Sequence, residues 1–209
     1  MNKNLKLFTQ IIFYGSIWGI LEATIGHVLH FIPATIAGSI MFPIAALILY
    51  KAYEQTKSKT SLMYIGIVAS AIKSVNFLMP QLSVFKTINP MISILFESLV
   101  VIVVIHFVTK ENKVQNILSL VFASISWRGI FVGWMGLQYI LTGNLAPYLK
   151  TFALGFEFII IVGIISGLFA AILVMLSKVV IKKPVFNINQ KPIFASFLLL
   201  TALFLTYTL

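Results

Sequence analysis

Several charged side chains of this 209-residue sequence lie inside long apolar stretches, where a charge needs a partner. The acidic ones are Glu22, Glu97 and Glu157, and the basic ones are Lys73 and Arg128. A charge at the centre of a bilayer costs about 2.5 kcal/mol or more unless it pairs or meets water. These residues therefore predict either buried ion pairs or a hydrated binding site.

Helical spacing places these charges beside further polar side chains. Residues three or four positions apart share one face of a helix. The groups that follow this rule are Glu22, Gly26 and His30 with His27 alongside, Lys73 with Asn76, and Asn89 with Ser93 and Glu97. Such stripes indicate that the polar side chains face one another or a common cavity rather than lipid.

Two interpretations of this polar set stay open. In the structural one, Glu97 pairs with Lys73, and Arg128 pairs with Glu22 or Glu157. In the functional one, the carboxylates, cations and histidines exceed what pairing requires, and they bind a small polar or zwitterionic ligand. The candidate site then comprises Glu22, His27, His30, Lys73, Asn76, Asn89, Glu97, Arg128 and Glu157, with Trp127, Trp134 and Tyr139 as stacking surfaces.

Composition indicates the class of protein. Hydrophobic residues make up 60% of the chain and charged residues 10%, and the mean hydropathy is +1.04. These values are typical of an integral membrane protein and leave no room for a soluble catalytic domain. Cysteine is absent, which excludes disulfides, thiolate metal sites and cysteine nucleophiles.

Apolar periodicity predicts an all-α polytopic bundle of six to seven transmembrane helices. The predicted spans are 8–31, 34–53, 61–79, 89–109, 114–141, 151–177 and 192–207. We expect Pro43 to kink the second span, and Asn89 and Pro90 to start the fourth as cap and first helical residue. The chain then divides into a six-helix core (1–177), a basic cytoplasmic linker (178–191) and an additional C-terminal transmembrane helix (192–209).

The distribution of lysines predicts the orientation of the bundle. Nearly all loop lysines fall on one side, and only Lys86 and Lys150 fall on the other. The positive-inside rule therefore places the N-terminus in the cytoplasm and the polar set in the outer half of the membrane. The net charge of +10 is then explained by topology and by contact with membrane lipids, without nucleic acid.

The motifs predict no bound cofactor or metal. The sequence contains neither a His-Glu-x-x-His zinc motif nor a Gly-rich phosphate loop. At the helical rise, His106 lies about 25 Å from the outer histidines, too far for a shared haem. Any ATP-driven step must therefore come from a partner.

A stripe of small residues runs along the first span. Gly15, Gly19 and Ala23 recur at four-residue spacing, which lets another helix approach closely, either within the chain or from another subunit. With the chain length, the number of spans and the outer polar site, this stripe resembles the substrate-binding S component of energy-coupling-factor (ECF) transporters. The resemblance implies that Gly15, Gly19 and Ala23 contact a transmembrane coupling subunit, which works with cytoplasmic ATPases. The seventh span and the short connection after the first span depart from that family's usual pattern.

We therefore expect a multi-pass cell-membrane protein that captures a small polar solute from outside as a subunit of an ECF-type importer. Two alternatives stay open. The first is a self-contained secondary transporter in which Glu22, Glu97 or Glu157 couples transport to protons. The second is an intramembrane enzyme in which Glu22, His27 and His30 act as acid-base or metal groups on a lipid-soluble substrate.

Overall fold

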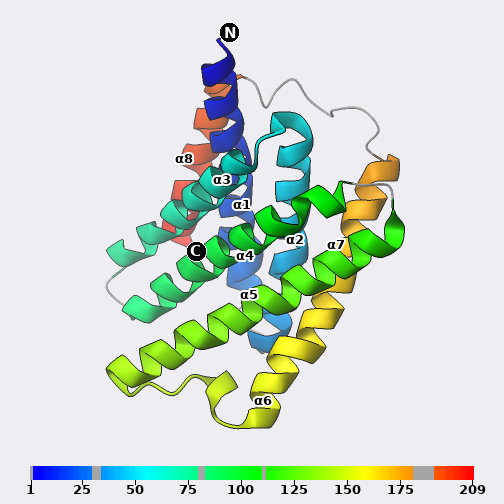
Figure 1. Ribbon diagram of the computed structural model, residues 1–209. Helices are drawn as coiled ribbons and strands as arrows, with labels where there is room; N and C mark the ends of the chain where they lie inside the picture. Colours follow the sequence, from blue (N-terminus) through cyan, green and yellow to red (C-terminus); the bar gives the residue numbers. More distant parts are fainter. Residues whose placement is uncertain (1, 30–33, 80–82, 110–111, 181–190) are drawn as a thin grey trace.

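The structure of this protein, a computed structural model, describes residues 2–29, 34–79, 83–109, 112–180 and 191–209. Regular secondary structure in these ranges is entirely helical, and no strand occurs among the described residues. The helices pack side by side in one bundle (Figure 1). This confirms the predicted all-α fold class.

The described helices follow the predicted spans closely. They are α1 (Lys3–Leu29), α2 (Ala34–Thr56), α3 (Lys59–Lys73), α4 (Val84–Val108), α5 (Lys113–Thr142), α6 (Phe152–Phe156), α7 (Val162–Val180) and α8 (Pro192–Thr208). Short segments extend or join them: the 3₁₀ segments η1 (Ser74–Leu78) and η2 (Pro147–Leu149), and the π-helical segment η3 (Glu157–Ile161). Because η3 joins α6 to α7 without a break, these three segments form one long rod.

Length and hydropathy identify the membrane-spanning elements. Five described stretches are long and apolar enough to cross a membrane: Lys3–Leu29, Lys59–Leu78, Val84–Val108, Lys113–Thr142 and Phe152–Val179. The 17 residues of α8 span roughly 25 Å at the helical rise, slightly less than a hydrocarbon core. The chain is therefore a helical membrane protein. Residues 181–190 of the predicted linker lie outside the described residues, and α7 continues to Val180.

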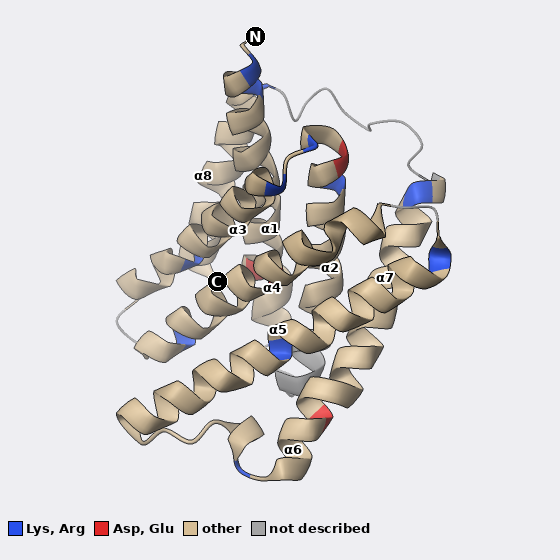
Figure 2. Cartoon of the chain, in the orientation of Figure 1, with Lys and Arg blue, Asp and Glu red and all other residues tan. Residues whose placement is uncertain are grey.

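Positive charge gathers at one end of the bundle. Figure 2 shows Lys and Arg around the N-terminus, the α2–α3 turn, the start of α5 and the end of α7. Lys86 and Lys150 lie toward the opposite end, near the start of α4 and before α6. This arrangement is the one that the positive-inside rule requires, so we call the lysine-rich end cytoplasmic and the other end outer.

The predicted start of the fourth span is wrong. α4 begins at Val84, with Ser83 in an extended conformation before it, so Pro90 lies inside the helix and Asn89 is no cap. A proline in the second turn still removes only one backbone hydrogen bond. Because Asn89 does not cap the helix, its side chain can make contacts with other helices of the bundle.

Two glycines of the α1 stripe, Gly15 and Gly19, pack against α3 within the chain, and the contact of the stripe with a partner subunit stays a prediction. A Cβ atom added to Gly15 would lie 2.6 Å from Val68 Cγ1, and one added to Gly19 would lie 2.7 Å from Ile72 Cδ1. Ala23 is also buried. Gly15 and Gly19 therefore form an internal helix contact with α3 of the kind that small residues permit, whereas Ala23 lines a cavity at the other end of α1.

Candidate functional site: the outer cavity

A cavity of about 960 Å³ opens at the outer end of the bundle. Side chains from α1, α2, α3, η1, α4, α5, the 144–148 loop, η3 and α8 line it. Its polar lining includes Glu22, His27, Lys73, Asn76, Lys86, Asn89, Ser93, Glu97, Gln138 and Tyr148. We refer to this space as the outer cavity.

Most of the predicted site residues meet in the outer cavity. Glu22, His27, Lys73, Asn76, Asn89 and Glu97 all line it, although they come from four separate segments. His30 lies outside the described residues. The convergence follows from the topology, because α1 and α3 end, and α4 begins, at the same end of the bundle.

Glu157 does not join this group. Its side chain is exposed on η3, whereas its neighbour Phe158 is buried and lines the outer cavity. The sequence places both residues in one apolar span, and the helix rotation decides which of them points inward. We therefore remove Glu157 from the candidate site.

Glu22 and Lys73 form the first charged couple of the cavity. The two side chains attract each other electrostatically, and Trp18 Nε1 donates a hydrogen bond to Glu22 Oε1 at 3.3 Å. Neither charge has an ion-pair partner within 4.0 Å among the described residues. Gly26 gives the carboxylate room, since an added Cβ would lie 3.4 Å from Glu22 Oε2. The couple thus stays open to the cavity instead of closing as a contact ion pair.

Glu97 and Arg128 form the second couple. Glu97 is 2% exposed, and its Oε1 accepts a hydrogen bond from Ser93 Oγ at 3.2 Å. Its Oε2 is buried and accepts no hydrogen bond from the described part of the chain. Arg128 provides the nearby opposite charge. The observed couples therefore differ from the expected ones: Lys73 faces Glu22, and Arg128 faces Glu97.

Arg128 lies behind the wall of the outer cavity. Its side chain is fully buried, and it donates from one terminal nitrogen to the Ser124 carbonyl at 3.0 Å and to Ser124 Oγ at 2.6 Å. The guanidinium carbon lies 4.6 Å from the Trp127 ring centroid and 5.7 Å from that of Phe158. Arg128 thus stabilises Glu97 and the aromatic wall without lining the cavity. The sequence predicted Arg128 as a ligand-binding residue, because a buried arginine in either role looks the same in sequence.

Aromatic rings form the inner wall. Trp127, Phe131 and Phe158 are buried and line the cavity. Tyr148 of η2 stacks on Phe158 with ring centroids 4.0 Å apart, so the outer loop folds onto this wall. Burial raises the pKa of the Tyr148 phenol above its ordinary value, and the charge of Arg128 opposes that shift. The phenol is therefore neutral at physiological pH.

Asn89 ties α4 to α5 at the cavity wall. Its Oδ1 accepts hydrogen bonds from Trp134 Nε1 at 3.1 Å and from Gln138 Nε2. Its Nδ2 contacts Met135 Sδ at 3.9 Å. Because the amide oxygen is already used twice, Asn89 positions α5 rather than offering a free acceptor.

Two further polar atoms along the cavity have no hydrogen-bond partner in the described part of the chain. They are Asn76 Oδ1 and Trp127 Nε1, and both are buried. Buried polar groups in folded proteins are nearly always hydrogen-bonded, to protein, water or ligand. Glu97 Oε2 belongs to the same class, and all three atoms are closed off from the cavity that their residues line.

Sequence reasoning missed several cavity residues. Gln138 lies one turn after Trp134 on α5, a spacing that could have revealed it. Tyr148 and Phe158 carried no such signal, because one lies in a loop and the other in an apolar run. The π-helical turn that aims Phe158 inward has no pattern in the sequence, although such turns are frequent at functional sites. Tyr139, which we expected as a stacking surface, is exposed and does not line the cavity.

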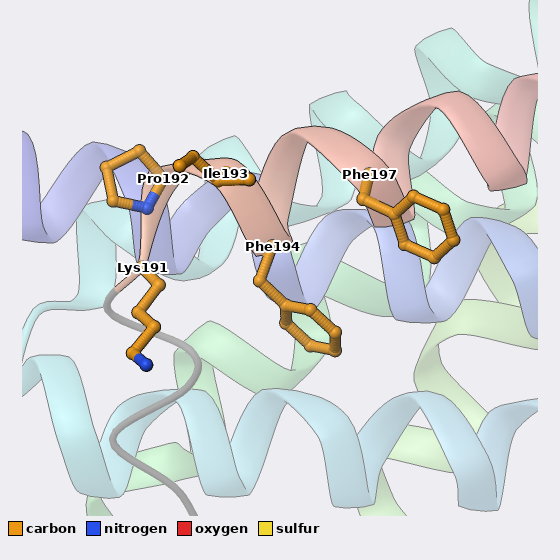
Figure 3. A pocket seen from close by; sticks show the side chains of 5 residues that line it. All are labelled: Lys191, Pro192, Ile193, Phe194 and Phe197. Carbon is orange, nitrogen blue, oxygen red and sulfur yellow. The ribbon is translucent and has the colours of Figure 1, made fainter.

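Among the described residues, neither a metal-ligand cluster nor the hollow beside α8 offers an alternative site for a polar solute. Among the described residues, no group of three or more His, Cys, Asp or Glu side chains could hold a metal ion. A hollow of about 560 Å³ lies at the cytoplasmic start of α8, lined by Lys191, Pro192, Ile193, Phe194 and Phe197 (Figure 3). Those side chains come from one helix end, and Lys191 is their one polar member. An apolar surface of this kind suits lipid.

Comparisons of the chain with protein-family models, with curated proteins and with solved structures found no match.

Proposed function

We propose that this membrane protein binds a small polar molecule in the outer cavity and acts as the solute-capture subunit of an importer. One observation supports the proposal above the others. Six polar or charged side chains from α1, α3, η1 and α4 converge on a single cavity of about 960 Å³; they are Glu22, His27, Lys73, Asn76, Asn89 and Glu97. A cavity with largely apolar walls and a few convergent polar groups is the usual form of a small-molecule site.

The charge arrangement also supports ligand binding. Glu22 and Lys73 attract each other without closing to 4.0 Å, which leaves a polar ligand room between or beside them. Replacing buried ion pairs by apolar packing is often neutral or stabilising, so a purely structural role does not account for both couples. A zwitterionic or hydrogen-bonding solute would complete the pairing.

The importer role rests on the architectural resemblance to ECF S components. In this proposal the outer cavity captures the solute, and a transmembrane coupling subunit with cytoplasmic ATPases supplies the energy. Gly15 and Gly19 pack against Val68 and Ile72 of α3, so in this proposal the coupling subunit contacts another surface of the bundle. α8 lies against α1 and contributes Thr206 to the cavity wall.

The test starts with the purified protein. Native mass spectrometry of the detergent-solubilised chain should show a retained small molecule, and the variant Glu97→Gln should lose it. The variant Glu157→Gln is the matched control, because Glu157 is an exposed carboxylate outside the cavity. Wild-type protein that retains no molecule and is stabilised by no solute would contradict the proposal. Co-purification with a coupling subunit and ATPases would test the importer role separately.

A second candidate, an intramembrane enzyme, is favoured by one observation: Glu22 and His27 line the same cavity. Such a pair supplies a carboxylate and an imidazole for acid-base chemistry. The enzyme would convert the retained molecule without any partner, whereas a capture subunit would release it unchanged. Mass analysis of the released molecule after prolonged incubation separates the two.

A further inference from the structure

We propose that an anionic phospholipid binds at the lysine-rich end of the bundle, with its phosphate beside Lys191 and Lys6 and an acyl chain along the exposed face of α8. The outer cavity opens at the opposite end, so this inference does not depend on the proposed function. It follows from an apolar hollow, from the way α8 packs on α1, and from lysines that have no acidic partner.

The hollow at the start of α8 has the composition of a site for an acyl chain. Its volume is about 560 Å³, and its one polar lining residue, Lys191, stands at its head (Figure 3). Two of its apolar members, Ile193 and Phe197, are 87% and 62% exposed. On a helix of a membrane protein, such side chains face hydrocarbon, while a lysine keeps its ammonium group at the level of the lipid headgroups.

The packing of α8 on α1 brings a second lysine to the same level. The two helices run in the same direction, and the rings of Phe13 and Phe194 lie 6.1 Å apart (Figure 1). Lys6 lies seven positions before Phe13, on the same face of α1. Lys191 lies three positions before Phe194, and Figure 3 shows both side chains on one side of α8. At the helical rise, the two lysines therefore differ in height by roughly 6 Å, about one turn.

The positive charge at this position has no protein partner. Lys3, Lys6 and Lys191 form no ion pair with any described residue, whereas Lys51 at the same end of the bundle pairs with Glu54 at 2.8 Å. No side chain caps the start of α8, so the positive end of its dipole adds to the same field. Unpaired cations at headgroup level attract anionic lipids, and a phosphate accepts hydrogen bonds from ammonium groups. A zwitterionic lipid brings its own cation and gains less here.

A second copy of the chain suits this surface less well than a lipid does. Among the described residues, Glu54 is the one carboxylate at the lysine-rich end, and Lys51 already binds it. A second copy would therefore bring more lysines to the contact and no free counter-charge. An anionic lipid supplies the counter-charge and the apolar chain in one molecule.

Lipid titration of the purified full chain tests the site. Detergent-solubilised protein is depleted of lipid and then titrated with phosphatidylglycerol or with phosphatidylcholine that carries the same acyl chains. Glycerol phosphate serves as the headgroup without chains, and native mass spectrometry counts the bound molecules. We expect phosphatidylglycerol to be retained at concentrations at which phosphatidylcholine is lost and glycerol phosphate does not bind.

Matched variants locate the contacts. Lys191→Gln and Lys6→Gln should each weaken phosphatidylglycerol binding by about fivefold, the usual contribution of one basic residue near an anionic surface. Lys113→Gln removes the same charge from the start of α5, on the far side of the bundle from α8 (Figure 1), and should bind like wild type. Phe197→Ala should weaken the binding of both lipids. Phe204→Ala, two turns further along α8 and outside the hollow, should not.

Four results would overturn the inference. Equal retention of the two lipids, or no retention of either, would show that the lysines select no anionic lipid. An equal loss of binding in Lys113→Gln and Lys191→Gln would show a diffuse field in place of a site. Binding of glycerol phosphate as tightly as phosphatidylglycerol would assign the lysines to a free anion. A dimer that excludes lipid would assign the surface to a second copy. Because both lysines are exposed, their variants should fold, and Lys6→Gln provides a reading independent of Lys191→Gln.

Discussion

Ser93 Oγ donates a hydrogen bond to Glu97 Oε1 at 3.2 Å, one helical turn earlier on α4. The contact fixes one carboxylate oxygen, and the other is buried with no hydrogen-bond partner in the described part of the chain. The same spacing that places both residues on one helix face therefore produces a half-satisfied carboxylate in a membrane protein. Arg128 on α5 supplies the charge that makes this arrangement tolerable.

Double-mutant cycles can measure the interaction energy of each charged couple at the outer cavity. Arg128→Met removes the charge that offsets Glu97, and stranding a buried charge costs about 3 to 5 kcal/mol of unfolding free energy. We expect Glu97→Leu to restore most of that loss in the double variant. Lys73→Met should likewise be compensated by Glu22→Leu and less by Glu97→Leu, since Lys73 faces Glu22. Unfolding in detergent measures each cycle, and a larger coupling between Lys73 and Glu97 would contradict the observed arrangement.

The glycine stripe of α1 predicts a stability effect. Gly15→Leu or Gly19→Leu introduces side-chain atoms where Val68 and Ile72 already lie, so either change should lower the free energy of unfolding by about 1 to 3 kcal/mol or more. Gly133→Leu is the matched control, because nothing lies within 4 Å of its added Cβ. In that open position, loss of glycine should leave stability unchanged or raise it. Gly19→Leu with wild-type stability but no partner binding would restore the partner-face hypothesis.

Periodicity and turn residues were sufficient to predict the helices. The predicted span 114–141 corresponds to α5, Lys113–Thr142. Gly143 ends this helix with a left-handed φ of 73°. The start of α4 was missed, because a proline at the second turn of a helix looks in sequence like a proline at the first. Depth counting also gathered Glu22, Lys73 and Glu97 correctly at one end of the bundle. Depth counting could not predict which carboxylate faces which cation. Residues at the same depth differ in the rotation of their helices and in which helices are neighbours, and the sequence shows neither.

The orientation in the membrane stays a prediction, and the absence of cysteine makes it testable. Single cysteines can be introduced at Asn144, in the loop beside the outer cavity, and at Lys59, at the start of α3, and both positions are exposed. A membrane-impermeant maleimide should label Asn144→Cys in intact cells and Lys59→Cys only after the membrane is opened. The reverse pattern would invert the topology and place the cavity opening in the cytoplasm.

Tyr148 should couple the outer loop to ligand binding. Its ring lies 4.0 Å from Phe158, and both residues line the outer cavity, so the stacked pair closes part of the wall. Tyr148→Ala removes that wall and should weaken retention of the bound molecule, mainly through faster dissociation. Tyr148→Phe keeps the stacked ring and should bind like wild type, because no hydrogen bond to the phenol is needed for the stacking.

The measurement is the dissociation rate of the retained molecule from purified protein, followed by native mass spectrometry after dilution. Phe152→Ala serves as the control, since Phe152 is 88% exposed and lies just beyond the same loop. A structural role for Tyr148 alone would lower the melting temperature of Tyr148→Ala equally with and without the bound molecule. A role in the cavity lowers the melting temperature more when the molecule is present, because the variant then loses ligand stabilisation as well as ring packing. Equal dissociation rates for wild type and Tyr148→Ala would show that the loop does not cover the site.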